Sequence, residues 1–342
     1  RTRRTHMNLK LILVYLITIA SFCRADSASD DYKNGDYESA ALRYQIQAEA
    51  GNARSQNNLG ALYLRGKGVS QNYQKAYELF LQSAGENFKG AMFNLGIMNL
   101  RGYGRAKNYP EAAIWFKQGA ELGDPEAQFF LGVLLSKGLG VQSDLAKAKK
   151  WFSKSADSGL AAAQFNIAII LLKESEHHSN RVDALDWLKK ADDQEYEMAT
   201  FQLATEYLRN SENQLDREKA SQLMLKLALK GHVRAQMQLG LLYLFGDAQD
   251  LNSEEGFFWL KESAMQDFAP AQHNLGAMYA QGIGGESNLK RAYAWLKIAS
   301  TSIAQAEVDS LIIREKMSEN ELRSAEMLVD EITAQIANGK EL

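Results

Sequence analysis

Amide and basic side chains recur at fixed intervals along this chain of 342 residues, and they are its best candidates for binding chemistry. Carboxamides occupy most places of a series spaced by 36 residues, with Phe130 as the exception: Asn58, Asn94, Asn166, Gln202, Gln238 and Asn274. A cation follows seven residues later in five consecutive places: Arg65, Arg101, Lys137, Lys173 and Arg209. Carboxamides hydrogen-bond a peptide backbone and cations pair with carboxylates. These two series, the amide–basic ladder, therefore predict a surface for an extended protein segment or another acidic ligand.

The five cations also have an explanation that involves no ligand. If each cation ends a helix, the negative end of the helix macrodipole stabilises its charge. The sequence leaves both interpretations open.

Catalytic and metal-binding patterns are weak in this sequence. The pair His177 and His178 could bind a metal only with carboxylates such as Glu174, Glu176 and Asp183, and an exposed polar loop is the simpler interpretation. No Ser/His/Asp, Cys/His or paired-carboxylate arrangement can be defined from spacing. We therefore predict a protein without catalytic residues, bound metal or cofactor.

The amide–basic ladder is one part of a repeat of 36 residues. We call the small residue two places after each ladder amide the anchor of its repeat: Gly60, Gly96, Gly132, Ala168, Ala204, Gly240 and Gly276. A Leu or Ile precedes every anchor, and an Ala or Ser lies five residues before it. An unbroken period of this length predicts one elongated repeat array in place of several globular domains.

Each repeat is predicted to form two helices, because Ala, Leu, Lys, Glu and Gln are plentiful and strand-like alternation is scarce. Helix A runs from about eight residues before the anchor to five after it. Helix B is centred on a small residue sixteen places after the anchor, so the two backbones can approach closely. The five Trp of the chain all lie nineteen places after an anchor, and we expect them to fill the sides of this contact.

Glycines are predicted to end helix A six residues after the anchor, for example at Gly102 and Gly246. Many repeats add a second Gly two places later. The resulting Gly102-Tyr103-Gly104 pattern follows a helix and not a strand, which favours a helix C-cap over a phosphate-binding loop. Gly or Asn at the turn nine residues before the anchor suits a left-handed backbone. Glu195 at this turn does not, and it predicts a looser repeat.

The predicted array is an all-α solenoid of antiparallel helix pairs, with seven repeats, a half repeat before them and capping helices after them. Residues 37–50 match an isolated helix B. Residues 302–313 and 318–336 form the cap, the second helix opening with a capping box of Ser318 and Glu321. We divide the chain into a leader (1–25), the solenoid (26–300) and the C-terminal cap (301–342).

The first residues resemble a secretory signal peptide. Met7 and Lys10 precede an apolar run from Leu11 to Ala20, and small residues around Arg24 predict cleavage after Ala25. Acylation at Cys23, the only cysteine, is the alternative, but a bulky Phe precedes it.

Removing the leader's five basic residues from the 39 Lys and Arg leaves 34 against 42 Asp and Glu, a net charge of −8. We expect a periplasmic or secreted protein that does not bind nucleic acid.

The repeated pattern resembles the Sel-one-like repeat family, relatives of tetratricopeptide repeats. The matching stretches include NNLGALYLRGKGV with KAYELFLQSA and QFFLGVLLSKGLGV with KAKKWFSKSADSG. The resemblance covers residues 37–300, and the tail MSENELRSAEMLVDEI is similar to a closing segment of bacterial members. It implies a right-handed superhelix whose concave surface, lined by helices A, binds proteins or cell-envelope components.

Three functions remain to be separated. The first is a non-catalytic, monomeric scaffold without a membrane span, which binds a protein segment or an acidic envelope component along the amide–basic ladder. The second is an envelope hydrolase acting on β-lactams or peptidoglycan. It rests on family analogy, and the relatives with that activity carry a disulfide in each repeat, whereas the mature chain has no cysteine. The third is a structural spacer between larger assemblies.

Overall fold

The computed structural model describes residues 28–174, 178–209, 213–246, 252–283 and 286–339. The predicted signal peptide and its cleavage site lie outside these residues. The chain divides into two compact units, residues 1–184 and 185–342. Every element within the described ranges is a helix, and none of these helices has the length and apolar character needed to cross a membrane.

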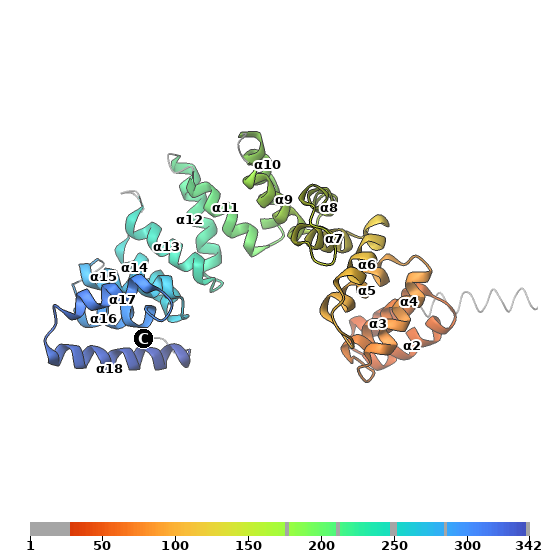
Figure 1. Ribbon diagram of the computed structural model, residues 1–342, viewed down its shortest axis with the longest axis horizontal. Coiled ribbons are helices and arrows are strands. Elements are labelled where there is room, and N and C mark those ends of the chain that lie inside the picture. Colours follow the sequence, from red (N-terminus) through yellow and green to blue (C-terminus); the bar gives the residue numbers. More distant parts are fainter. Residues whose placement is uncertain (1–27, 175–177, 210–212, 247–251, 284–285, 340–342) are drawn as a thin grey trace, which may run out of the picture. The chain divides into compact units, whose positions relative to one another are not determined.

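After a short helical segment at residues 28–33, the first unit contains α2 and then successive helix pairs (Figure 1). Its helices are α2 (Tyr37–Glu49), α3 (Ala53–Arg65), α4 (Tyr73–Gly85), α5 (Lys89–Arg101), α6 (Tyr109–Glu121), α7 (Pro125–Lys137), α8 (Leu145–Asp157) and α9 (Ala161–Lys173), followed by the start of α10 (His178–Asp192). α2 is the predicted isolated helix B. The odd-numbered helices are helices A and start and end within a residue of their predicted bounds.

The second unit continues the same alternation and ends in the cap. Beyond the rest of α10 it contains α11 (Glu197–Arg209), α12 (Gln214–Ala228), α13 (Val233–Phe245), α14 (Ser253–Met265), α15 (Ala269–Gln281), α16 (Leu289–Ala299), α17 (Ala304–Arg314) and α18 (Glu319–Ala337). The two units together confirm the predicted all-α succession of seven helix pairs, a leading half repeat and two capping helices.

Helices A and B of one repeat meet at the anchor, as predicted, but the side chain that fills the contact is not the Trp. A Cβ added to Gly96 would lie 2.5 Å from Phe116, and one added to Gly132 would lie 2.8 Å from Phe152. Phe116 and Phe152 lie twenty places after their anchors and are almost fully buried. Trp115, one place earlier, is only half-buried. Trp115 and Trp259 line the spaces between successive helices B instead.

The two glycines that follow helix A have different roles. Gly102 caps α5 in the left-handed conformation with a φ of 75°, as predicted, and Gly66, Gly138 and Gly282 do the same. The prediction is wrong for Gly246, which is extended at φ −68° and ψ −171°. The second glycine allows close packing between repeats, because a Cβ on Gly140 would lie 2.3 Å from the backbone of Tyr109 at the start of α6.

The turn before each helix A has a left-handed residue even where the sequence argues against one. Glu195 has a φ of 58°, close to the values at Asn87 and Asp267 in the equivalent turns. Glu195 therefore adopts the left-handed turn that its residue type argues against, and the looser repeat stays a prediction. The turn geometry is set by the packing of the helices that it joins, and a non-glycine residue accepts the associated strain.

The C-terminal cap is held to the last repeat by both apolar and polar contacts. α18 runs beside α16 (Figure 1), and its Ala325 and Ile332 are buried against that repeat. The predicted capping box of Ser318 and Glu321 is present at its start. α17 is tied to α15 by His273, whose Nε2 lies 2.7 Å from Oδ2 of Asp309.

Candidate functional site

The ladder cations of the first unit all occupy the last position of a helix A. Arg65, Arg101, Lys137 and Lys173 end α3, α5, α7 and α9, and all four are exposed. Arg65 donates from Nη1 to the Tyr32 hydroxyl over 3.4 Å. The other three form no ion pair with any described residue. Their position agrees with macrodipole stabilisation, and their exposure leaves them available to an acidic ligand.

The ladder amides of the first unit are half-buried and are partly used in internal hydrogen bonds. Asn94 on α5 donates to Asn57 on α3 over 2.8 Å, and Asn57 donates to Asn58 over 3.4 Å. Asn166 donates to the carbonyl of Ala162 in its own helix over 2.7 Å. The Asn94–Asn57 hydrogen bond joins two neighbouring helices A, so this amide contributes to packing between repeats as well as to the surface.

A burial effect on Tyr44 supports this internal role. Desolvation raises the pKa of the Tyr44 phenol, while hydrogen bonds with Asn58 and Ser29 act in the opposite direction. Asn58 on α3 is therefore hydrogen-bonded to Tyr44 on α2. Where the series has Phe130, an aromatic cluster replaces the amide, with ring centroids 5.3 Å from Phe116 and 5.8 Å from Phe93.

In the second unit an acidic residue neutralises the ladder at α11. Glu206 is 2 % exposed, and its Oε1 lies 3.2 Å from both Nε2 of Gln202 and Nη1 of Arg209. Sequence reasoning missed Glu206, although a carboxylate four places after an amide and three before an Arg could have indicated it. Gln238 on α13 and Asn274 on α15 are half-buried, and no ladder cation accompanies them. The cationic part of the ladder thus lies in the first unit.

Three helices A of the first unit, α3, α5 and α7, lie side by side. α5 packs directly on α7, and the Asn94–Asn57 hydrogen bond joins α5 to α3. This arrangement brings the exposed ends of successive helices A to one side of the layer, because each helix has the same phase relative to its anchor. His177 of the possible metal site lies outside the described residues, as does the side chain of His178, so that expectation stays untested.

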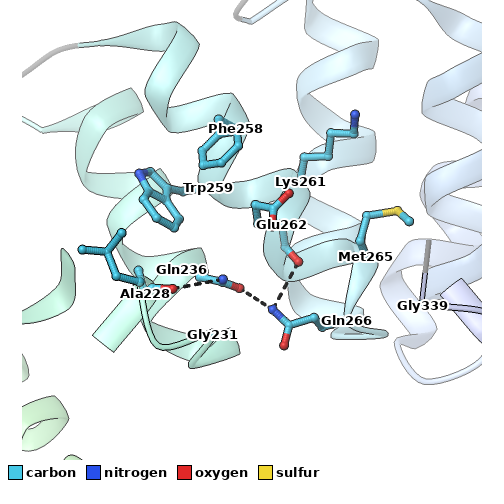
Figure 2. A pocket seen from close by; sticks show the side chains of 11 residues that line it. Ala228, Gly231, Gln236, Phe258, Trp259, Lys261, Glu262, Met265, Gln266 and Gly339 are labelled. Carbon is cyan, nitrogen blue, oxygen red and sulfur yellow. Dashed lines mark hydrogen bonds between the residues drawn. The ribbon is translucent and has the colours of Figure 1, made fainter. Parts of the chain in front are cut away.

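Three pairs of successive helices B have a pocket between them, and these pockets lie at the same place in the repeat. One of about 410 Å³ lies between α2 and α4, and one of about 490 Å³ lies between α4 and α6. The second unit has one of about 700 Å³ between α12 and α14 (Figure 2). Each is lined by the residue four places before an anchor: Gln56, Met92 and Gln236. We call these three spaces the helix-B pockets.

Buried glutamines four places before the anchor are a feature that sequence reasoning missed. Their Nε2 atoms donate across the turn to a carbonyl at the end of the preceding helix B, at 3.2–3.4 Å. The residues concerned are Gln56, Gln128, Gln164, Gln236 and Gln272. Because the last carbonyls of a helix lack intrahelical partners, these glutamines cap helix B from the next helix A. Their regular spacing was the available signal.

The helix-B pocket of the second unit combines exposed apolar groups with a closed pair of amides. Leu229 is 71 % exposed and Phe258 is 49 % exposed at its rim. Figure 2 shows Gln266 reaching Gln236, to which it donates over 2.7 Å, while Gln236 donates to the carbonyl of Ala228. The acceptor of Gln236 in this pocket is therefore satisfied by the chain's own Gln266, whereas Nε1 of Trp259 is buried without a partner among the described residues.

Comparison with known proteins identifies the repeat. The Sel1 repeat model matches residues 53–87, 90–124, 125–160, 161–194, 233–268 and 269–302. The repeat with anchor Ala204 is not matched, although α11 and α12 give it the same helix pair. A comparison with curated proteins gave no match.

Two solved structures share this architecture. A Sel1 repeat protein from Oxalobacter formigenes is 26 % identical with a TM-score of 0.60, over 84 % of this chain and 91 % of that one. A protective antigen of uropathogenic Escherichia coli with an SLR fold is 26 % identical with a TM-score of 0.56, over 89 % of this chain and 73 % of that one. From its repeats and its helix-pair architecture, the chain belongs to the Sel1 repeat family.

Proposed function

We propose that the protein is a non-catalytic scaffold that binds an acidic, extended protein segment across the ends of α5, α7 and α9. Sel1 repeat proteins are generally protein-interaction scaffolds, and this membership supports the class of function. The observation that carries the proposal is the row of exposed cations Arg101, Lys137 and Lys173, which pair with no described carboxylate in a chain with more acids than bases. Nothing in the described residues favours the hydrolase alternative.

The expected ligand follows from the charges and geometry of this row. Exposed cations attract carboxylates weakly when single, but several in register act together on an extended chain. The half-buried Asn94 and Asn166 beside them add hydrogen-bonding groups for the ligand's backbone. We place this function in the periplasm or outside the cell, and the mass of the exported protein would test it, since cleavage after Ala25 leaves Asp26 as the first residue.

Charge reversal tests the proposed surface. The full chain is titrated against a fluorescein-labelled peptide of alternating Glu and Ser, and anisotropy is recorded at low and high salt. We expect binding that weakens with salt and that falls about tenfold or more in the variant Arg101→Glu/Lys137→Glu, since two attractive contacts become repulsive.

The matched control reverses two cations in the other layer of the same unit. Lys117 on α6 and Lys150 on α8 are exposed, so Lys117→Glu/Lys150→Glu changes the net charge equally without touching helices A. We expect this variant to lose little affinity. Equal losses in both variants would show that only net charge matters and would refute the proposed surface.

A further inference from the structure

Two of the helix-B pockets differ in one hydrogen bond at their floor. Gln56 and Gln236 occupy the same repeat position, and each donates its Nε2 to the helix-B carbonyl behind it. Oε1 of Gln236 accepts from Gln266 over 2.7 Å. Oε1 of Gln56 is buried and has no hydrogen-bond partner among the described residues. A buried acceptor without a donor is unfavourable. Oε1 of Gln128, at the same repeat position, is also buried without a partner among the described residues, so the orphaned acceptor points to a ligand only where a pocket lies beside it, as it does between α2 and α4.

The residue that would complete this pocket has the wrong chemistry. Glu86 stands where Gln266 stands in its own repeat, and both follow their helix B with nearly the same backbone, φ −89° and ψ 18° against φ −88° and ψ 23°. Gln266 supplies an N–H donor, whereas the ionised carboxylate of Glu86 can only accept. The chain therefore fills one pocket with its own carboxamide and leaves the equivalent acceptor in the other without a donor.

The α2–α4 pocket has room and a neutral balance of charge. Its volume is about 410 Å³, and Ala48, Leu59 and Leu79 provide an apolar floor beside Gln56. Lys75 and Glu49 line it with opposite charges. The Lys75 ammonium donates to the Tyr63 hydroxyl over 2.6 Å, and Glu49 accepts from Gln45 over 3.0 Å. A neutral donor with an aliphatic stem fits these surroundings better than an ion.

We propose that this pocket binds the side-chain carboxamide of a Gln or Asn in a partner protein, which donates to Oε1 of Gln56 as Gln266 donates to Gln236. The methylene stem of the incoming side chain packs on Leu59 and Leu79. This site belongs to the helix-B layer and is independent of the amide–basic ladder, so either site can fail without the other.

The test uses a small probe and the leucine methyl signals of the full chain. N-acetyl-glutamine methylamide is added to methyl-labelled protein, with its side-chain N,N-dimethyl derivative as the control that lacks the donor. We expect the Leu59 and Leu79 signals to shift and saturate in the millimolar range with the first compound and to stay unchanged with the second. Methylguanidinium, a charged donor, is added in a third titration. Equal shifts with both glutamine compounds, or shifts with methylguanidinium alone, would overturn the proposal.

Three variants separate this site from general effects on folding. Glu86→Gln supplies the missing donor, so it should block the probe and raise the melting temperature. Gln56→Met removes the acceptor with a residue that the next repeat carries naturally at Met92, so it should also abolish the shifts. Gln266→Ala frees the acceptor of Gln236 and should create new probe-dependent shifts at Leu229. Undiminished binding by Glu86→Gln, or no new site in Gln266→Ala, would refute the assignment.

Discussion

At the scale of single residues, the turns between repeats carry strain that the helices impose. The residue nine places before the anchor has a positive φ in all seven repeats, and it is a glycine at Gly51, Gly123, Gly159 and Gly231. Asn87, Glu195 and Asp267 adopt the same backbone with a side chain. Asn and Asp tolerate this conformation because their short side chains hydrogen-bond locally, but Glu has no such advantage.

Replacing Glu195 with glycine should therefore stabilise the second unit. We expect Glu195→Gly to raise the free energy of unfolding by about 0.5–1 kcal/mol, since relief of left-handed strain outweighs the added entropy of the unfolded chain. The lost contact with Lys230, 3.5 Å long and exposed, contributes little. Urea unfolding measures the effect. Asn87→Gly is the control with a smaller expected gain, and a destabilised Glu195→Gly would contradict the strain at this turn.

At the scale of elements, the second loop glycine sets how closely consecutive repeats stack. Gly140 has a φ of 70°, and a Cβ added to it would lie 2.3–2.6 Å from the backbone of Tyr109 and Pro110. A Cβ added to Gly104 would lie 2.5 Å from the side chain of Tyr73. Backbone cannot move aside as a flexible side chain can. The glycine therefore serves the contact between repeats as well as the local turn.

Two matched substitutions separate these contributions. Gly140→Ala should destabilise by about 2–4 kcal/mol, the sum of left-handed strain and overpacking. Gly159→Ala introduces only the left-handed strain, because no atom lies within 4 Å of the added Cβ. It should lower the free energy of unfolding by about 1 kcal/mol. Both are measured by chemical unfolding. Equal losses would mean that the loop does not limit the approach of neighbouring repeats.

The attachment of α17 should depend on pH. Burial opposes ionisation of Asp309, but hydrogen bonds from His273 and Gln305 and the charge of His273 outweigh it and hold the pKa of Asp309 below its usual value. A lowered pKa stabilises the fold above the unfolded value, near 4, and this stabilisation disappears as pH falls through the folded pKa.

Asp309→Asn should therefore be less stable than the parent at pH 6 and approach it at pH 3. The urea midpoints of the two proteins at both pH values give this comparison. Asp330→Asn on the exposed side of α18 is the control and should differ from the parent equally at both values. A constant gap between Asp309→Asn and the parent would show that ionisation of Asp309 does not hold α17 in place.

At the scale of the whole molecule, the repeats present two layers with different surfaces. In the first unit, the helix-A layer exposes cations at successive helix ends. The helix-B layers of both units contain pockets at a fixed repeat position. The period alone predicts the helices, because a small anchor residue and periodic apolar neighbours specify the pair, and the bounds agree closely.

The core side chains, the pockets and the pairing of the ladder depend on contacts between side chains, which periodicity does not specify. The repeated Trp favoured position nineteen as the side chain at the anchor. Phe116 and its equivalents lie one place later, and one residue along a helix changes the direction of a side chain by about 100°. Gln56 and Gln236 occupy the same repeat position and are the same residue type. Only the structure shows that Oε1 of Gln236 accepts a hydrogen bond while Oε1 of Gln56 does not. Within the ladder, the period of 36 residues treats all five cations alike, and only the local spacing of Glu206 and Arg209 indicates that these two pair.

The central claim is that the helix-A layer of the first unit recognises an acidic protein segment, and photo-crosslinking tests it most directly. The alternating Glu and Ser peptide, carrying a central benzophenone, is irradiated with the full chain, and the crosslinked residues are mapped by mass spectrometry. The account predicts crosslinks in the last turns of α5 and α7, near Arg101 and Lys137, that disappear at high salt. Crosslinks confined to α4, α6 and α8 would contradict it.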